Sequence, residues 1–157
     1  RVNFEQVEVD AKWLLAGPTE NVMSRGIGAR TGGYQTCTLA LGLAGAAIEF
    51  MIAEGRNRQD IVPPAKALKN QWNELRKMLL DSTSSRQITR AESLRQQCNS
   101  LALRATQASL AVAKGSGFVF GHPAGRWCRE ALFFMVWSCP QSVINGQLYQ
   151  LAEILPE

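Results

Sequence analysis

The feature that most constrains the fold is a long proline-free stretch from Thr19 to Val62. After several glycines, its apolar residues recur at helical intervals, at Leu39, Leu43, Ala46 and Phe50. This spacing places side chains on one face of an α-helix. Many of the intervening residues are Gly or Ala, which would let a second helix approach closely. Pro63 and Pro64 end this helix and begin the next, because proline suits the first turn of a helix.

Two further segments have the same period. Residues 64–81 carry one apolar stripe, made of Leu68, Trp72, Leu75 and Leu79. Residues 81–85 are predicted as a polar loop, and Thr89 with Glu92 forms a capping box that begins the third helix. That helix continues to about Ala113, with an apolar stripe of Leu94, Cys98, Leu101, Ala105, Ala108 and Val112.

A fourth helix is expected from Pro123 to about Ser138, and a final turn or helix over residues 142–155. Four amphipathic helices joined by short connections predict an all-α fold, an antiparallel up-down-up-down four-helix bundle with a short N-terminal extended segment. The bundle is predicted to span residues 19–157.

The N-terminal residues have a different pattern. Residues 1–15 alternate apolar and polar side chains, which is typical of a β-strand. A strand cannot satisfy its backbone hydrogen bonds alone. We therefore expect residues 1–18 to be the remnant of an upstream β domain and its linker, which ends in the turn-forming Gly17-Pro18.

Composition narrows the function classes. The net charge of +4 comes from scattered basic residues interleaved with acids and amides, which does not favour nucleic-acid binding. Arg, Lys, Glu or Gln interrupts each apolar run, so no membrane span is expected. The four cysteines have no CxxC spacing and His122 is the only histidine, so no metal site is predicted. Reduced thiols in apolar helices favour a cytoplasmic location.

The segment from Lys114 to Ala131, KGSGFVFGHPAGRWCREA, carries the most specific pattern. It resembles the acyl-CoA dehydrogenase family, whose last long helix follows a Gly-rich turn and begins with Pro-x-x-Arg-x-x-Arg-Asp-Ala. The matching positions here are Gly115, Gly117, Phe118, Pro123, Arg126, Arg129, Glu130 and Ala131.

Two more segments match that family in the same order. Residues 39–58 are similar to the first helix of the family's C-terminal bundle, which is rich in Gly and Ala and ends in an arginine pair. Residues 4–15 are similar to the last strand of its middle domain and the link into the bundle. The resemblance covers nearly the whole chain, but only the C-terminal part of a typical family member.

The resemblance implies an oxidoreductase that binds FAD and acts on an acyl-CoA or related substrate, and a homo-oligomer, either dimer or tetramer. It implies cofactor contacts at Arg58, Gly115, Gly117 and Phe118. Guanidinium suits a diphosphate, because it is permanently charged and can hold two oxygens at once. Alternatively, Arg58 is a solvated residue at a helix end, and the two glycines are a helix-ending turn.

The family's catalytic base is missing. Its usual glutamate, which follows an aromatic residue after the last long helix, corresponds to Ser138 after Trp137. The other location used in the family corresponds to Gly33-Tyr34, again without a carboxylate. Serine has no basicity near neutral pH. We therefore expect no ordinary α,β-dehydrogenation, and an isolated chain that is inactive.

Three functional hypotheses follow. The first is the C-terminal domain of a divergent flavoprotein related to acyl-CoA dehydrogenases. The second is a flavin-dependent monooxygenase of the same family, in which reduced flavin and O₂ need no glutamate base. The third is a non-catalytic helical module for oligomerisation or partner binding.

Overall fold

The structure is a computed structural model that describes residues 3–14, 20, 27–85 and 89–154, and within these it contains five α-helices and no β-strand. The chain divides into two compact units, Arg1–Arg30 and Thr31–Glu157. The second unit, called the helical unit below, contains nearly all the helical residues. The prediction of an all-α fold is therefore confirmed for the described part of the chain.

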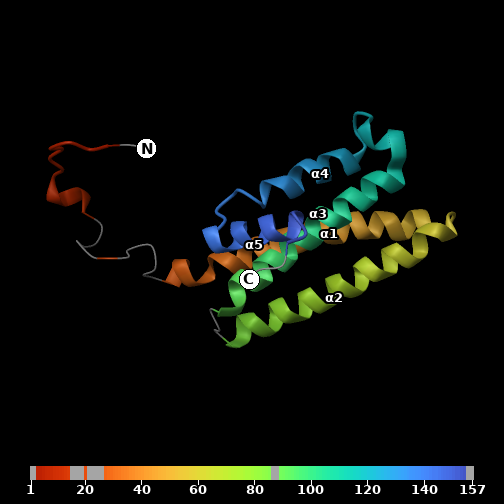
Figure 1. Cartoon of the computed structure of the whole chain (residues 1–157), viewed down its shortest axis with the longest axis horizontal. Helices are drawn as coiled ribbons and strands as arrows, with labels where there is room; N and C mark the ends of the chain where they lie inside the picture. The colour runs from red at the N-terminus through yellow and green to blue at the C-terminus, as the bar shows by residue number, and fades with distance from the viewer. Residues whose placement is uncertain (1–2, 15–19, 21–26, 86–88, 155–157) are drawn as a thin grey trace. The chain divides into compact units, whose positions relative to one another are not determined.

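The helices follow one another with short connections (Figure 1). They are α1 (Ile27–Gly55), α2 (Val62–Ser85), α3 (Thr89–Ala113), α4 (Pro123–Phe133) and α5 (Gln141–Leu151). Short 3-10 helices lie at Ala11–Trp13 (η1), Gln59–Ile61 (η3) and Lys114–Phe118 (η4).

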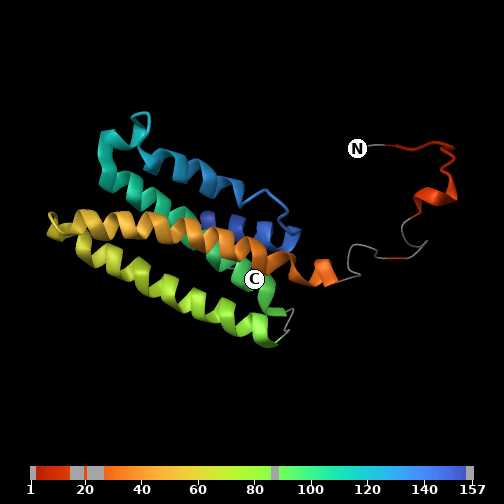
Figure 2. The ribbon, with the colours of Figure 1, turned by 180° about the vertical axis from the view of Figure 1, so that it is seen from behind.

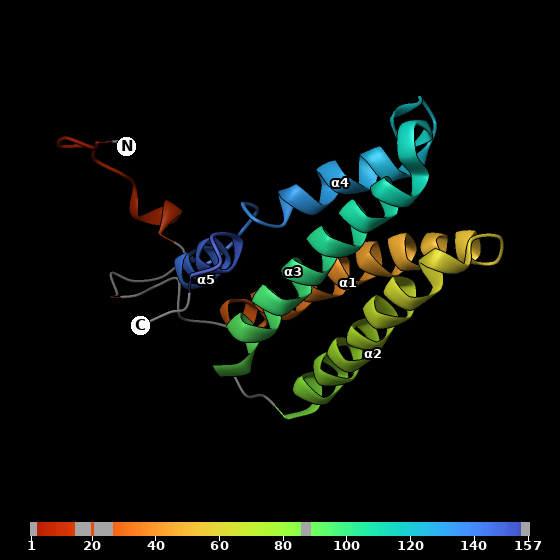
Figure 3. The same ribbon diagram turned by 45° about the vertical axis from the view of Figure 1, so that its right-hand side comes forward.

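Helix α3 lies at the centre of the helical unit, because α2, α4 and α5 all pack against it. Figures 1 and 2 show that α1, α2, α3 and α4 run in alternating directions, with η3 and η4 at the same end. Figure 3 shows α4 following α3 along one side. Helix α5 packs against the first half of α3, where Gln150 Nε2 donates to Ser100 Oγ at 2.8 Å.

The core face of α1 differs from the predicted face. Leu39 is 52 % exposed and Ala46 is exposed, whereas the buried residues are Cys37, Ala40, Leu41, Ala44, Ala47, Ile48 and Met51. The helix is apolar on all sides, so periodicity alone could not choose the buried one. The small residues do permit close packing, since a Cβ built on Gly45 would lie 3.1 Å from Trp72 Nε1. That indole N–H donates to the Leu41 carbonyl at 2.8 Å.

The predicted apolar stripes of α2 and α3 are confirmed: their leucines and Cys98 are buried, and Trp72 packs against the core. The predicted loop at 81–85 is wrong, because α2 continues to Ser85 and buries Ser82. The side chain of Thr89 lies outside the described residues, so its capping box remains a prediction.

The predicted extent of the fourth helix is also wrong, since α4 ends at Phe133 rather than near Ser138. Residues 134–138 form tighter turns, which begin with a bond from the Phe134 N–H to the Ala131 carbonyl at 3.2 Å. Side chains of α3 bind the freed carbonyls, as described below. The final element, predicted as a turn or helix over residues 142–155, is the helix α5, which ends earlier, at Leu151.

The predicted N-terminal strand is not formed in residues 3–14, where Ala11–Trp13 is a 3-10 turn capped by Asp10. Asp10 Oδ1 accepts from the Lys12 N–H at 3.0 Å. A strand gains its hydrogen bonds only from a neighbouring strand. The prediction of an upstream β domain therefore stays a prediction, and residues 15–18 lie outside the described part of the chain.

One stretch of α1, residues 34–55, is long and apolar enough to cross a membrane by length and composition alone, and half of it, 50 %, is buried inside the structure. Buried core helices of soluble proteins have the same property. The expectation that no segment spans a membrane stays a prediction.

Candidate functional site

The Gly-rich turn and the start of α4 lie in direct contact. A Cβ built on Gly125 would lie 2.7 Å from the Gly117 carbonyl oxygen, so two backbones meet where no side chain fits. His122 caps α4, with Nδ1 accepting from the Ala124 N–H at 3.2 Å. Its ring meets Phe50 of α1 edge-on, with centroids 5.5 Å apart. The turn is thereby fixed between α1 and α4.

A groove of about 480 Å³ opens on this turn and is called the turn groove. It is lined by residues 117–123 together with Gly125, Arg126 and Arg129. Arg126 Nε lies 3.2 Å from a carboxylate oxygen of Glu130, whereas Arg129 has no ion-pair partner among the residues that the structure describes. The N-terminus of α4 adds partial positive charge. The turn groove therefore has the electrostatics of an anion site.

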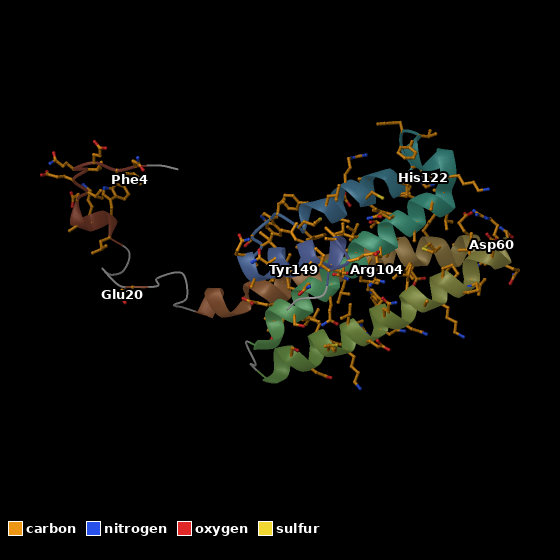
Figure 4. The ribbon with its side chains drawn as sticks, viewed as in Figure 1. Phe4, Glu20, Asp60, Arg104, His122 and Tyr149 are labelled. Atoms are coloured by element: carbon orange, nitrogen blue, oxygen red, sulfur yellow. The ribbon has the colours of Figure 1, made fainter. Side chains whose placement is uncertain are left out.

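Arg58 lies at the same end of the helical unit. Its Nη1 donates to the Val112 carbonyl at 2.9 Å, which caps the last turn of α3 just before η4. Glu54 and Asp60 each place a carboxylate oxygen 4.0 Å from its guanidinium. Figure 4 shows Asp60 and His122 at this common end. Arg58 is thus neither fully solvated nor free to serve a ligand alone.

The predicted cofactor contacts have unequal surroundings. A Cβ built on Gly117 would lie 2.5 Å from Leu110 Cδ1, so internal packing already requires this glycine. A Cβ built on Gly115 meets no atom within 4 Å, which leaves open space for a ligand. Phe118 is 79 % exposed, and Val119 and Phe120 beside it are exposed as well. Three consecutive exposed apolar side chains form a surface that another molecule could cover.

A second groove, the α1–α4 groove, is almost entirely apolar and measures about 580 Å³. Its lining residues are Thr38, Leu39, Gly42, Leu43, Glu130, Phe133, Phe134 and Trp137. The rings of Phe133 and Trp137 stack on each other with centroids 5.3 Å apart. The exposed face of α1, on which the sequence analysis expected core residues, forms one wall.

The lining of this groove includes neighbours of two positions where the family's base is missing, Ser138 and Tyr34, but not those residues themselves. Trp137, directly before Ser138, lines it from the turn after α4. Thr38 lines it from α1, and its hydroxyl donates to the carbonyl of Tyr34 at 2.9 Å. Ser138 has a positive φ of 48° and is exposed. Gly33 belongs to the backbone of α1. Glu130 is the one carboxylate of the lining, and Arg126 pairs with it.

Arg95, which the sequence pattern did not single out, is only 1 % exposed. It lies four residues after Ala91 and three before Cys98, on the core stripe of α3. This helical spacing could have predicted that Arg95 is buried. Its Nη2 donates to the Trp137 carbonyl at 3.0 Å, and Asn99 Nδ2 donates to the Phe134 carbonyl at 3.0 Å. These bonds hold the turn that ends the α1–α4 groove.

No known protein family, curated protein or solved structure matches this chain. Within the described residues, no three His, Cys, Asp or Glu side chains are grouped so that they could hold a metal ion.

Proposed function

We propose that this chain is the C-terminal helical domain of a FAD-dependent oxidoreductase related to the acyl-CoA dehydrogenases, without the usual glutamate base. The observation that carries the proposal is the meeting of Arg58, the η4 turn and the arginines of α4 at one end of the helical unit. In the proposed bundle, α1 to α4 form the antiparallel up-down-up-down quartet. Their alternating directions support this arrangement, with α5 as an addition to it (Figure 1).

The backbone at Lys114 supports the resemblance independently. The family usually has glycine at this position, and Lys114 has φ of +54°. L-residues adopt this left-handed region at a cost, whereas glycine does so freely. The conformation at Lys114 is therefore one that suits the glycine of the family's pattern.

The residues fit a dinucleotide in charge and in space. Arg129 and Arg58 would hold the diphosphate, and the open side of Gly115 would allow close approach of its oxygens. Phe118 would cover an apolar part of the ligand. Bound FAD would supply the electron-transfer chemistry, as it does in flavoproteins generally.

The α1–α4 groove would take the apolar part of a substrate such as an acyl chain. Its apolar walls would offer dispersion contacts to such a chain, because Leu39, Leu43 and Phe133 line it. Its one carboxylate, on Glu130, is paired with Arg126, so no free base faces the substrate from the described lining. This favours the monooxygenase relative over an α,β-dehydrogenase as the second candidate function.

The test is FAD binding by the complete protein encoded by the gene. We expect a yellow protein with stoichiometric flavin. We also expect Arg129→Ala to weaken FAD affinity about tenfold, which equals about 1.4 kcal/mol. Arg104→Ala is the matched control, because Arg104 is exposed on α3 and its one side-chain bond within the described part of the chain is to Ser100. We expect residues 1–157 alone to bind FAD weakly, because the predicted site includes other domains and a second subunit.

The two flavin reactions differ in their oxidant. Oxygen consumption supported by NADH or a reductase would identify the monooxygenase, and reduction of an artificial electron acceptor by acyl-CoA would identify the dehydrogenase. A colourless complete protein without FAD affinity would contradict both and favour the non-catalytic helical module, for which a dimer or tetramer is the expected partner state.

A further inference from the structure

The core of the helical unit contains an arginine that lacks a counter-charge. Arg95 is almost fully buried, and neither its Nε nor its Nη1 has a hydrogen-bond partner among the described residues. Its Nη2 reaches only carbonyl oxygens, those of Trp137 at 3.0 Å and of Phe134 at 3.5 Å. An isolated buried charge is very costly, so a negative group nearby would be strongly stabilised.

Two fully buried thiols lie within reach of this charge. Cys37 comes from α1 and Cys98 from α3, three residues after Arg95 on the same helix face. A hydrogen bond joins the two thiols, and the charge of Arg95 acts on both. Alanines of the same core cluster, such as Ala40 and Ala102, leave α1 and α3 little side-chain bulk to separate them.

The pair is asymmetric. The hydrogen bond from Cys98 lowers the pKa of the Cys37 thiol, and the charge of Arg95 acts in the same direction, whereas burial opposes them. The same hydrogen bond, together with burial, raises the pKa of the Cys98 thiol. Of the two thiols, Cys37 is therefore the one that gives up its proton more easily. This order suits Cys37 as the nucleophile and Cys98 as the resolving thiol.

We propose that Cys37 and Cys98 form a peroxide-sensitive dithiol with Arg95 as its fixed counter-charge, and that oxidation links α1 to α3 by a disulfide. The proposal is independent of flavin binding. It identifies a modification site, and the oxidant is hydrogen peroxide. Peroxide is little larger than water and can reach the core through local opening of the helices.

The reaction balances with one peroxide. The Cys37 thiolate attacks a peroxide oxygen, so that an S–O bond forms, the O–O bond breaks and hydroxide leaves. Hydroxide takes up the proton that Cys37 had released and becomes water. Cys98 then attacks the sulfenic sulfur, and its proton leaves with the hydroxyl group as a second water. The two thiols lose two electrons, and these reduce the peroxide to two waters.

The other two cysteines have different surroundings. Cys128 donates its S–H to the Thr106 carbonyl at 3.3 Å, and burial raises its pKa. Burial also raises the pKa of Cys139, against the opposing charge of Arg95. Both are partly exposed, so they must be removed before the buried pair can be measured.

The experiment uses the full chain with Cys128→Ser and Cys139→Ser, treated with hydrogen peroxide while folded. We expect the intact mass to fall by two hydrogens, a non-reduced peptide map to contain a Cys37–Cys98 cross-link, and dithiothreitol to reverse both. Unmodified thiols after prolonged treatment would overturn the proposal. Addition of oxygen to the chain without a cross-link would also overturn it.

Single variants in that background test the asymmetry. Cys98→Ser should stop at the sulfenic acid of Cys37, which dimedone traps, whereas Cys37→Ser should leave Cys98 unreactive. Equal reaction of the two would contradict the role of Cys37 as the nucleophile.

The role of Arg95 is tested by a pH titration of the ultraviolet absorption of the thiolate. We expect the band that disappears in Cys37→Ser to form at a lower pH in the parent than the band of an ordinary thiol, and its formation at or above the ordinary pKa would contradict the counter-charge. Arg95→Gln should slow peroxide oxidation about tenfold or more, and Arg95→Lys, which keeps the charge, should restore most of the rate. If Arg95→Gln does not fold, the absorption band of the parent still decides the question.

Discussion

Two arginines bind backbone carbonyls at helix C-termini at opposite ends of α3, in contrasting environments. Arg58 binds the carbonyl of Val112, keeps about a third of its side chain exposed (32 %) and has two carboxylates 4.0 Å away. Arg95 binds the carbonyls of Phe134 and Trp137 from inside the core, with no carboxylate beside it among the described residues. Water and the two carboxylates therefore screen the charge of Arg58, whereas the charge of Arg95 is screened much less.

The difference in exposure between Arg58 and Arg95 suits the two arginines to different roles. Because the end near Arg58 is wet, its arginine can exchange protein partners for a ligand phosphate at small cost. Because Arg95 is dry, it cannot leave its carbonyls without a large loss, and it fixes the turn that borders the α1–α4 groove. The first arginine suits recognition of a ligand, and the second suits positioning of the fold and of the buried thiols.

The comparison predicts that the largest effect on stability comes from replacing the buried Arg95. Arg95→Ala should lower the free energy of unfolding by about 3 kcal/mol, because it opens a cavity and leaves the Trp137 carbonyl without its donor. Urea denaturation of the chain would measure this. Arg104→Ala, at an exposed position of the same helix, should change stability by less than about 0.5 kcal/mol. Unchanged or increased stability in Arg95→Ala would mean that the unpaired charge costs as much as its bonds contribute.

At the end of the helical unit near Arg58, backbone packing should contribute more to stability than charge does. Gly125→Ala puts a methyl group 2.7 Å from the Gly117 carbonyl, where only backbone can move. Overpacking of about 3 kcal/mol, offset by about 1 kcal/mol of helix propensity, predicts a net loss of about 2 kcal/mol. Gly115→Ala is the control, because its Cβ meets no atom within 4 Å. Equal stability of the two variants in thermal denaturation would show that η4 and α4 are not closely held.

The contrast between exposed and buried positions also explains which parts of the fold the sequence could predict. In α2 and α3 the apolar residues recur every three or four positions and polar residues occupy the other faces, so the buried faces were predictable. In α1 apolar residues occur on every face, and only the position of its neighbours decides that Ala40 is buried and Leu39 exposed. The end of α4 depends on Arg95 and Asn99, which are distant in sequence, so its own residues could not reveal it.

The candidate site was predictable only in part. Gly115, Gly117 and Phe118 were identified from a local pattern, and the turn that contains them is a local structure. The bond from Arg58 to Val112 spans 54 positions, so the chain pattern could not predict it. The thiol pair likewise joins two helices, and cysteines without a CxxC spacing gave no reason to pair Cys37 with Cys98.

Arg58 itself should contribute little to stability. Arg58→Ala removes one hydrogen bond of 2.9 Å and two distant, solvent-screened carboxylate contacts. We expect a loss of about 1 kcal/mol, a third of the loss at Arg95. Urea denaturation under the same conditions makes the two directly comparable. A loss as large as that of Arg95→Ala would mean that Arg58 is a structural residue first, which would weaken its assignment to a ligand.

The smallest expected effect concerns the residue that follows α3 directly. Lys114 has φ of +54°, so Lys114→Gly relieves backbone strain of about 1 kcal/mol and loses about 0.5 kcal/mol through the greater freedom of the unfolded chain. The variant should be about 0.5 kcal/mol more stable, measured as a higher denaturation midpoint. Ser116→Gly, two residues later and outside the positive-φ residues, should instead destabilise the chain by about 0.5 kcal/mol. If both glycines destabilise equally, the turn does not hold Lys114 in the left-handed conformation. The conformation of the η4 turn would then depend on a ligand or partner rather than on its own backbone.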